Sequence, residues 1–201
     1  RADVRSDPRH LLPSARSILC LGKLYNAPEP YSTAHNEPGC GWISRYAWGK
    51  DYHEIIGSAL EDLAGRLQAA LGQTFEWKAC VDTAPLLERA YAQRAGLGWI
   101  GRNSCLINQE SGSWFFLAAL LLSIEMEPDS PPPDRCGSCT RCIDACPTRA
   151  ILPTGSKNGP SHTVDSRRCI SYLTIELRGE IPPDLHPLVG RHIFGCDICQ
   201  D

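Results

Sequence analysis

The stretch CGSCTRCIDACP (residues 136–147) decides how the last third of the chain folds. Its cysteines follow the spacing C-x2-C-x2-C-x3-C and are followed by a proline. In proteins with two 4Fe–4S clusters, the first three thiolates of such a run bind one cluster and the fourth binds the other. Structural zinc sites more often combine two separate C-x2-C pairs. The run, which contains Cys136, Cys139, Cys142 and Cys146, therefore predicts an iron–sulfur module.

Three more cysteines near the end of the chain extend this prediction. RRCISY supplies one of them, and FGCDIC supplies the other two. We expect one cluster to be held by Cys146, Cys169, Cys196 and Cys199. We expect the other to be held by Cys136, Cys139 and Cys142, with a fourth ligand that the sequence does not contain. Because the sequence stops at CQD, in the middle of what should be a second run, we expect the missing cysteine just beyond Asp201.

Composition excludes several classes of protein. The 201 residues carry a net charge of −3, so no overall basic surface indicates nucleic-acid binding, although a local basic patch, for example at Arg167–Arg168, stays open. The longest apolar run, WFFLAALLLSI (114–124), is far shorter than the roughly 20 residues of a membrane helix. Eleven cysteines, an odd number, argue against a fully paired disulfide framework. We expect the four outside the cluster runs to be small buried apolar residues: Cys20, Cys40, Cys80 and Cys105.

The first 128 residues alternate strand and helix patterns. We expect strands at 17–25 and 74–82, and an amphipathic helix over 51–72 with Ile56, Leu60, Leu63 and Leu67 on one face. A second helix is expected over 82–95, with Thr83 or Asp82 as its cap, Pro85 in its first turn and Gly96 at its end. SCLIN (104–108) and WFFLAALLLS (114–123) predict two strands of a hairpin around the turn QESGS. The loop 153–163 carries no recognisable chemistry.

The stretch GLGWIGRNS (96–104) contains G-x-G-x-x-G, which is typical of dinucleotide-binding loops. That function requires a strand before the glycines and a helix after them. Here the order is reversed, because the glycines follow a helix and lead into strands. The pattern therefore does not predict a nicotinamide enzyme.

Asp82 occupies a position of interest, since it ends a predicted strand and precedes a predicted helix. Active-site residues of α/β folds commonly lie at such positions. The alternative is that Asp82 only caps the helix. The sequence by itself leaves both interpretations open.

Several motifs together resemble the epoxyqueuosine reductase family. They are VDTAPLLERAYAQRAGLGWIGRNS (81–104), GSWFFL (112–117), CGSCTRCIDACPTRAI (136–151), RCISYLTIE (168–176) and GCDICQ (195–200), and SRYAWGKDYH (44–53) and DPRHLLPSARSI (7–18) match its N-terminal motifs. The resemblance covers nearly the whole chain. It implies a cobalamin-dependent oxidoreductase with two 4Fe–4S clusters, which removes the epoxide oxygen of epoxyqueuosine in the tRNA anticodon to give queuosine.

The resemblance also implies roles for individual residues. Asp82 matches the proton donor of the family, and burial beside a corrin ring would raise the pKa of such a carboxyl group. Arg5 and Arg45 match positions near the cobalamin, the alternative being that they are ordinary exposed arginines. Further positions that match cobalamin contacts are Leu106, Ser171, Asp197 and Ile198. The glycines at 96, 98 and 101 would let the backbone pass close to the macrocycle, the alternative being a plain helix end and turn.

We therefore predict an α+β protein. It would have a mixed-sheet cobalamin-binding domain over 1–128, a proline-rich linker over 129–134 and a ferredoxin-like two-cluster 4Fe–4S module over 135–201. The resemblance implies as partners a tRNA that carries epoxyqueuosine and an electron-donor protein of the flavodoxin or ferredoxin type. It also implies a monomer in the cytoplasm, away from membranes. The family's C-terminal helical repeats do not follow in this sequence, so we expect a fragment.

Two alternatives remain open. A corrinoid reductive dehalogenase has related parts, but we expect it to carry a different proton donor and often an export signal. A ferredoxin-type electron-transfer module without catalysis of its own would not bind cobalamin.

Overall fold

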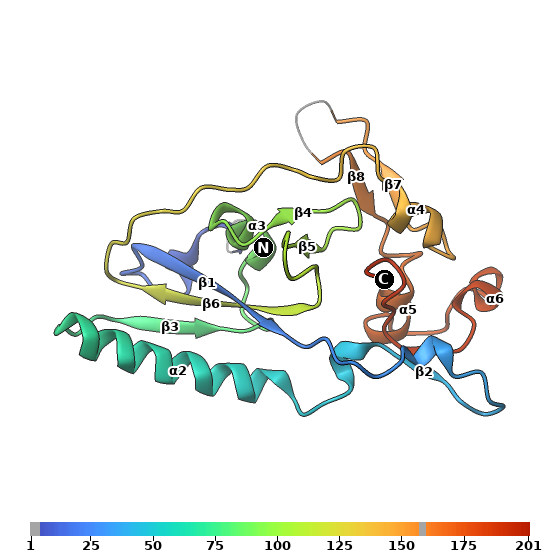
Figure 1. Cartoon of the computed structure of the whole chain (residues 1–201), viewed down its shortest axis with the longest axis horizontal. Helices are drawn as coiled ribbons and strands as arrows, with labels where there is room; N and C mark the ends of the chain where they lie inside the picture. Colours follow the sequence, from blue (N-terminus) through green and yellow to red (C-terminus); the bar gives the residue numbers. More distant parts are fainter. Residues whose placement is uncertain (1–4, 157–159) are drawn as a thin grey trace. The chain divides into compact units, whose positions relative to one another are not determined.

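Strand β6 (Phe115–Leu122) is the centre of a three-stranded sheet with the order β1-β6-β3 (Figure 1). The structure is a computed structural model that describes residues 5–156 and 160–201. The first residues of the predicted N-terminal domain and the middle of the 153–163 loop lie outside this description. β1 (Ser17–Leu24) runs antiparallel to β6 over its full length, and β3 (Trp77–Cys80) pairs antiparallel with the other edge of β6. The predicted strands are confirmed, but the sheet is antiparallel throughout rather than mixed.

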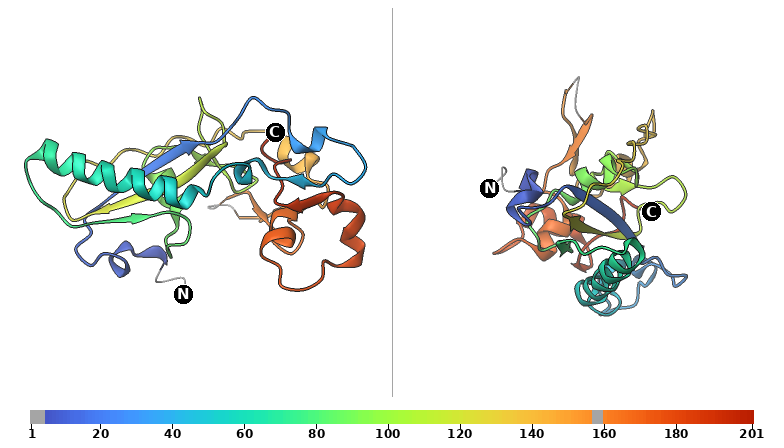
Figure 2. Two further views of the ribbon diagram at one scale, coloured as in Figure 1. Left: turned by 90° about the horizontal axis from the view of Figure 1, so that it is seen from below. Right: turned by 90° about the vertical axis from the view of Figure 1, so that its left-hand side faces the viewer.

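Both faces of this sheet are covered, because side chains alternate along β6. On one face, β6 packs against α2 (Tyr52–Leu71), which runs along the sheet in Figure 2. The buried residues of this layer include Ile56, Leu60 and Ala64 of α2 and Ala118, Leu120 and Leu122 of β6. On the other face, Ala119 and Leu121 pack with Cys80 and Leu86. Burial on both faces explains why β6 is apolar without interruption.

The long helix begins and ends as its sequence predicts. Asp51 is the N-cap, and its side chain accepts a hydrogen bond from the His53 N–H. Gly72 ends the helix in the left-handed conformation, with φ of 61°. In the middle of the helix, Ala64 is the buried residue, and the predicted Leu63 is not.

The second helix is shorter than predicted. α3 (Glu88–Arg94) has Leu87 as its N-cap, so the predicted caps, Thr83 or Asp82, are wrong. Residues 82–87 instead form a turn, in which the Thr83 N–H donates to the Val81 carbonyl and the Leu86 N–H donates to the Ala84 carbonyl. A residue before proline avoids helical backbone angles, which keeps the chain out of a helix before Pro85. The predicted end is confirmed, since Gly96 follows the helix with φ of 81°.

The predicted hairpin between SCLIN and WFFLAALLLS is wrong. β5 (Leu106–Ile107) pairs with β4 (Trp99–Ile100). Both edges of β6 are already occupied by β1 and β3. The QESGS turn is instead closed by an isolated bridge between Asn108 and Gly112.

The chain divides into two compact units that alternate along the sequence. The first, which contains the sheet, comprises Arg1–Leu24, Gly49–Trp99 and Leu106–Pro133. A short 3-10 helix, η1 (Pro8–His10), precedes β1 in this unit. The second unit comprises Tyr25–Trp48, Ile100–Cys105 and Asp134–Asp201. The contiguous boundaries drawn from the sequence stay a prediction.

The second unit consists of short elements around a small core. Its helices are η2 (Ser32–Ala34), η3 (Arg45–Ala47), α4 (Arg141–Ala145), α5 (Ile170–Ile175), η4 (Pro183–Leu185) and α6 (His186–Val189). β2 (Trp42–Ile43) pairs parallel with β9 (His192–Phe194), and β7 (Ile151–Pro153) pairs antiparallel with β8 (His162–Val164). Its core contains Ile170, Leu173, Leu185 and Val189. Parallel pairing between β2 and β9 brings residues 42–43 next to the last cysteine pair.

Two further expectations can be compared with the structure. Every one of the eleven cysteines lies in the described part of the chain and is free of disulfide bonds. Cys20 and Cys80 are buried as expected, and Cys105 is only partly buried. Cys40 is exposed, so the expectation is wrong for Cys40. Among the described residues, none of the helices has the length and apolar character needed to cross a bilayer.

Candidate active site and iron–sulfur centre

Asp82 lies in the first unit, two residues after the end of β3. Its φ of 53° is in the left-handed region, which costs a non-glycine residue about 1–2 kcal/mol. The side chain is 62% exposed, so the described residues alone do not bury it, and burial beside a corrin ring stays a prediction. Since Asp82 is not the helix cap, capping does not explain the conformation. A strained, exposed carboxylate at the end of a strand is a candidate functional group.

His53 lies beside Asp82 and was not among the predicted site residues. Its Nε2 is 3.4 Å from Asp82 Oδ2, and its Nδ1 is 2.7 Å from Asp51 Oδ1. The hydrogen bond with Asp51 is the largest cause of a raised pKa for His53, and Asp82 raises that pKa further. Tyr52 stacks on the imidazole with 4.1 Å between ring centroids. The Asp-x-His spacing at the helix start was the available signal, because it places both side chains at one helix end.

Glu88 is the second residue that sequence reasoning missed. Its Oε1 accepts a hydrogen bond of 2.9 Å from the Asp82 backbone N–H. Burial raises the pKa of Glu88 to about 7, although the bond from Asp82 lowers it in part. No sequence pattern marked Glu88, since an acidic residue in a first helical turn is common. Asp82 is thus contacted at its side chain by His53 and at its backbone by Glu88.

The predicted cluster ligands all lie in the second unit. Cys136 and Cys139 belong to one turn, closed by a hydrogen bond of 2.9 Å from the Cys139 N–H to the Cys136 carbonyl. Cys142 is on α4, and Cys146 is the C-cap of that helix. Cys169 is the N-cap of α5, whereas Cys196 and Cys199 follow β9.

Electrostatic interactions connect these seven thiols. Burial, followed by the charges of Cys199, Cys136 and Cys139, raises the pKa of Cys142. Burial raises the pKa of Cys196 to about 12, with further contributions from Cys199 and Cys169. A hydrogen bond with Cys105 and then burial raise the pKa of Cys199, to which the charge of Cys146 adds. The second unit therefore gathers all seven predicted ligands.

The surroundings of these thiols fit iron–sulfur clusters. The Ala150 N–H donates to Cys146 Sγ at 3.3 Å, and hydrogen bonds to sulfur are a feature of cluster sites. Within residues 5–156 and 160–201, no three His, Cys, Asp or Glu side chains are placed to hold a single metal ion. In a 4Fe–4S cluster each iron takes its own thiolate, so the ligands surround the cluster and not one ion. The donor set is thus that of a cluster.

The glycine-rich stretch 96–104 has a structural explanation. Gly96 ends α3 in the left-handed conformation, and a Cβ added to Gly98 would lie 2.2 Å from the Ile107 carbonyl oxygen. Further along, the Gly101 N–H donates to the Cys105 carbonyl at 2.8 Å, and Ser104 has φ of 62°. The end of α3 therefore explains Gly96, and the close approach of the Ile107 carbonyl explains Gly98.

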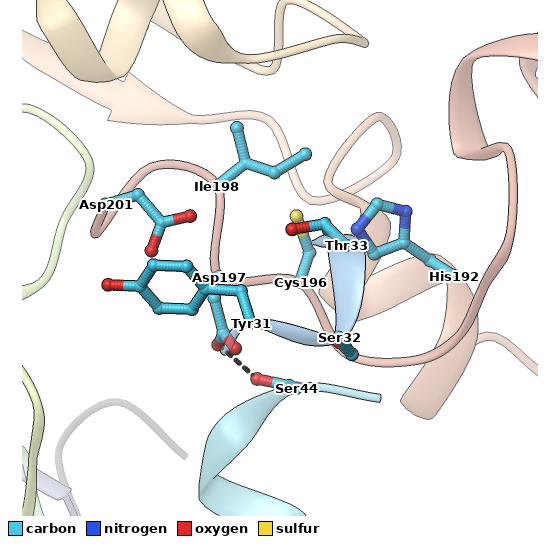
Figure 3. A pocket seen from close by; sticks show the side chains of 9 residues that line it. All are labelled: Tyr31, Ser32, Thr33, Ser44, His192, Cys196, Asp197, Ile198 and Asp201. Carbon is cyan, nitrogen blue, oxygen red and sulfur yellow. Dashed lines mark hydrogen bonds between the residues drawn. The ribbon is translucent and has the colours of Figure 1, made fainter. Parts of the chain in front are cut away.

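A small pocket in the second unit contains two of the predicted cofactor contacts, Asp197 and Ile198 (Figure 3). It is lined by Tyr31, Ser32, Thr33, Ser44, His192, Cys196, Asp197, Ile198 and Asp201. The Asp197 carboxylate accepts a hydrogen bond from the Ser44 hydroxyl, drawn in Figure 3, and another of 2.7 Å from the Arg45 N–H. These bonds fix the segment between the last two cysteines to residues 44–45.

Arg45 is 5% exposed, so the alternative of an exposed arginine is wrong for this residue. Its guanidinium donates to Asn26 Oδ1 and to the Ala27 and Glu29 carbonyls. It also lies over the rings of Tyr31 and Trp48, 4.4 and 4.8 Å from their centroids. Its described contacts therefore order the segment 26–31.

The remaining predicted contacts are distributed over both units. Ser171 donates to the Cys196 carbonyl at 3.4 Å in the second unit. Arg5 and Leu106 belong to the first unit, as does Asp82. Arg5 is exposed and its carbonyl accepts from the Leu87 N–H, whereas Leu106 is buried at 3% exposure. Their roles toward a cofactor stay a prediction.

Comparison with protein families identifies two regions. Residues 5–83 match the family model described as epoxyqueuosine reductase QueG, DUF1730. Residues 135–201, which contain the seven predicted ligands, match a 4Fe–4S double cluster binding domain. This second match supports two iron–sulfur clusters in the chain.

Curated relatives are similar over nearly the whole chain. An epoxyqueuosine reductase from Xanthomonas campestris is 45% identical over 201 residues, covering 98% of this chain and 54% of the relative. The epoxyqueuosine reductase of Escherichia coli is 42% identical over 198 residues, covering 98% of this chain and 50% of its own length. The chain therefore spans about half the length of these relatives.

Solved structures agree with these matches. The epoxyqueuosine reductase from Streptococcus thermophilus is similar with a TM-score of 0.82 and 35% identity, covering 98% of this chain and 51% of that one. A crystal structure of epoxyqueuosine reductase with an epoxyqueuosine-modified tRNA-Tyr stem loop has a TM-score of 0.83 and 37% identity, covering 98% and 50%. Sequence motifs, cysteine arrangement and fold agree: over nearly its whole length the chain is similar to about half of an epoxyqueuosine reductase.

Proposed function

We propose that the chain forms the reductive part of an epoxyqueuosine reductase that uses cobalamin, with Asp82 as proton donor. The observation that carries the proposal is the conformation of Asp82, a strained and exposed carboxylate beside His53, in a chain that also carries a two-cluster iron–sulfur domain. The substrate would be a tRNA with epoxyqueuosine in its anticodon. An unpaired anticodon base is accessible to a protein pocket, unlike a base inside a duplex.

The reaction is a two-electron reduction. Both carbon–oxygen bonds of the epoxide break, a carbon–carbon double bond forms, and the oxygen leaves as water after taking up two protons. The two electrons come from a donor protein of the flavodoxin or ferredoxin type. Clusters held by the seven cysteines would supply one-electron transfer, and a bound cobalamin would supply the reduction of the epoxide.

Asp82 delivers a proton to the departing oxygen in this proposal. Its exposed carboxyl group is accessible, and His53 Nε2, 3.4 Å from Asp82 Oδ2, is placed to return a proton to it. Glu88 holds the Asp82 backbone and does not contact substrate. These contacts support a defined direction for the carboxyl group.

The second unit has a small pocket of about 240 Å³, which would contact the edge of a corrin and not enclose its ring. Ser44, Ser32 and Thr33 bring hydroxyl groups to the pocket of Figure 3, and Ile198 brings an apolar side chain. A corrin carries amide groups at its edge and an apolar ring face, so both types of contact are needed. Asp197 and Ile198, which match cobalamin contacts of the family, both line this pocket.

The protein would act as a monomer in the cytoplasm.

Titration with cob(II)alamin tests the proposal. Protein reconstituted anaerobically with iron and sulfide should give a base-off EPR signal that saturates at one cobalamin per chain. Asp82→Asn should bind cobalamin equally but lower kcat on an epoxyqueuosine tRNA stem loop by about 10²–10⁴-fold. Asp62→Asn, an exposed change on α2, is the matched control.

A spectrum that stays that of free cofactor, with full iron content, would overturn the proposal. The chain would then be better described as an electron-transfer module without its own catalysis. Equal kcat for Asp82→Asn and wild type would remove Asp82 from the mechanism while leaving cofactor binding intact.

A further inference from the structure

Arg102 and Asn103 connect the glycine-rich stretch to both cysteine runs. Arg102 donates from Nη1 to the Cys139 carbonyl and from Nη2 to the Gly137 carbonyl, each at 2.6 Å. Asn103 donates from Nδ2 to the Cys199 carbonyl at 2.8 Å. The tight turn at 101–105 places these adjacent side chains so that each reaches a different run.

The two Nη donors of Arg102, called here the Arg102 fork, fix the backbone between two predicted ligands, Cys136 and Cys139. Gly137 and Cys139 lie in the turn that Cys136 begins, and Gly137 has φ of 49°. Two parallel donors from one planar guanidinium hold two carbonyls in a fixed relation, which a lysine does not reproduce. The path of the chain between the first two thiols therefore depends on Arg102.

A second observation is independent of these carbonyl contacts. Arg102 Nε is buried and, among the described residues, has no hydrogen-bond partner. A buried donor without a partner costs about 1–3 kcal/mol, so such atoms call for an explanation. Sulfur atoms of a cluster held by the neighbouring cysteines would provide an acceptor. The guanidinium also remains charged at any physiological pH.

We propose that Arg102 positions the loop of the first cluster, defined as the one held by Cys136, Cys139 and Cys142, and raises its reduction potential. A reduced cluster carries one more negative charge than an oxidised one. A fixed positive charge and hydrogen bonds toward sulfur therefore favour the reduced form. The proposal depends on cluster binding and not on the tRNA substrate.

An EPR-monitored redox titration of the reconstituted protein tests this role. Arg102→Gln replaces the charged guanidinium group by a shorter side chain that is polar and neutral. One of the two reduction waves should move to more negative potential, by about 59 mV for a tenfold change in the one-electron equilibrium. Arg102→Lys, which keeps the charge but loses the fork, should give a smaller shift. Arg178→Gln removes an exposed charge from the same unit and should move neither wave.

The iron content of each variant is measured together with its potentials, because it distinguishes loss of a cluster from a shift in the reduction potential of that cluster. Unchanged waves in a fully loaded Arg102→Gln protein would overturn the proposal, as would equal shifts of both waves. If Arg102→Gln and Arg102→Lys both lose the iron of one cluster while Arg178→Gln retains it, the positioning role is supported, because assembly then depends on the paired guanidinium donors. Loss of iron in Arg102→Gln but not in Arg102→Lys would overturn that role, because a lysine lacks these donors. Loss of iron in Arg178→Gln as well would overturn it.

Discussion

The backbone N–H of Asp82 donates a hydrogen bond of 2.9 Å to Glu88 Oε1, and this bond joins the turn after β3 to the first residue of α3. Asp82 is in a conformation that few non-glycine residues adopt. The bond that the Asp82 N–H donates to Glu88 offsets part of that cost and fixes the direction in which the Asp82 side chain leaves the backbone.

Stability should depend on pH through Glu88. Burial raises the pKa of Glu88 from its ordinary 4.5 to about 7, so the folded state binds more protons than the unfolded state between these values. Stability from this group is therefore greatest below about pH 4.5 and decreases as pH rises toward 7. Glu88→Gln cannot ionise, so its Tm relative to wild type should increase from pH 5 to pH 8. Thermal unfolding followed by circular dichroism at both pH values measures this.

Glu61→Gln is the control for that experiment, since Glu61 is exposed on α2 in the same unit. Its Tm difference from wild type should not change with pH. A constant difference for Glu88→Gln would show that Glu88 ionises normally and does not restrain Asp82 through a partly buried carboxylate.

Two substitutions of Asp82 should separate effects on folding from effects on catalysis, because this residue has a left-handed backbone conformation. Asparagine adopts this conformation readily, whereas a β-branched residue does not. Asp82→Asn should keep the stability of wild type, and Asp82→Val should lose about 1–2 kcal/mol in urea unfolding. Both should lose activity, because neither carries an acidic proton. Equal stability of the two variants would mean that residue 82 has ordinary backbone angles in solution.

The pKa of His53 should respond more to Asp51 than to Asp82. The hydrogen bond between His53 and Asp51 is the main cause of the raised pKa, and the contact with Asp82 contributes less. In an NMR titration of the imidazole, Asp51→Asn should lower the pKa of His53 more than Asp82→Asn does. Asparagine is also a good N-cap, so α2 should keep its start. A larger decrease in Asp82→Asn would assign the main interaction to Asp82 instead.

Much of the iron–sulfur module was predictable because cluster ligands follow a local spacing rule. The strands around β6 were also predictable, since β6 is a continuous apolar run with a simple pairing. The 82–87 turn was not predictable from the spacing of apolar residues, because helical spacing continues through it. Pro85 is also compatible with the first turn of a helix. His53 and Glu88 were missed for a different reason. Their importance comes from contacts with Asp82 across 29 and 6 residues, which no local pattern records.

The two glycines Gly98 and Gly57 should respond in opposite ways to the same substitution. A Cβ on Gly98 would lie 2.2 Å from the Ile107 carbonyl oxygen and 2.7 Å from its carbon, so backbone would have to move. Gly98→Ala should therefore cost about 3 kcal/mol or more. A Cβ on Gly57, inside α2, meets nothing within 4 Å, and Gly57→Ala should stabilise the protein by about 0.5–1 kcal/mol. Urea unfolding measures both. Tolerance of alanine at 98 would mean that the close approach of residues 98 and 107 does not require the glycine. The cobalamin affinity of Gly98→Ala would then test whether a bound group requires it.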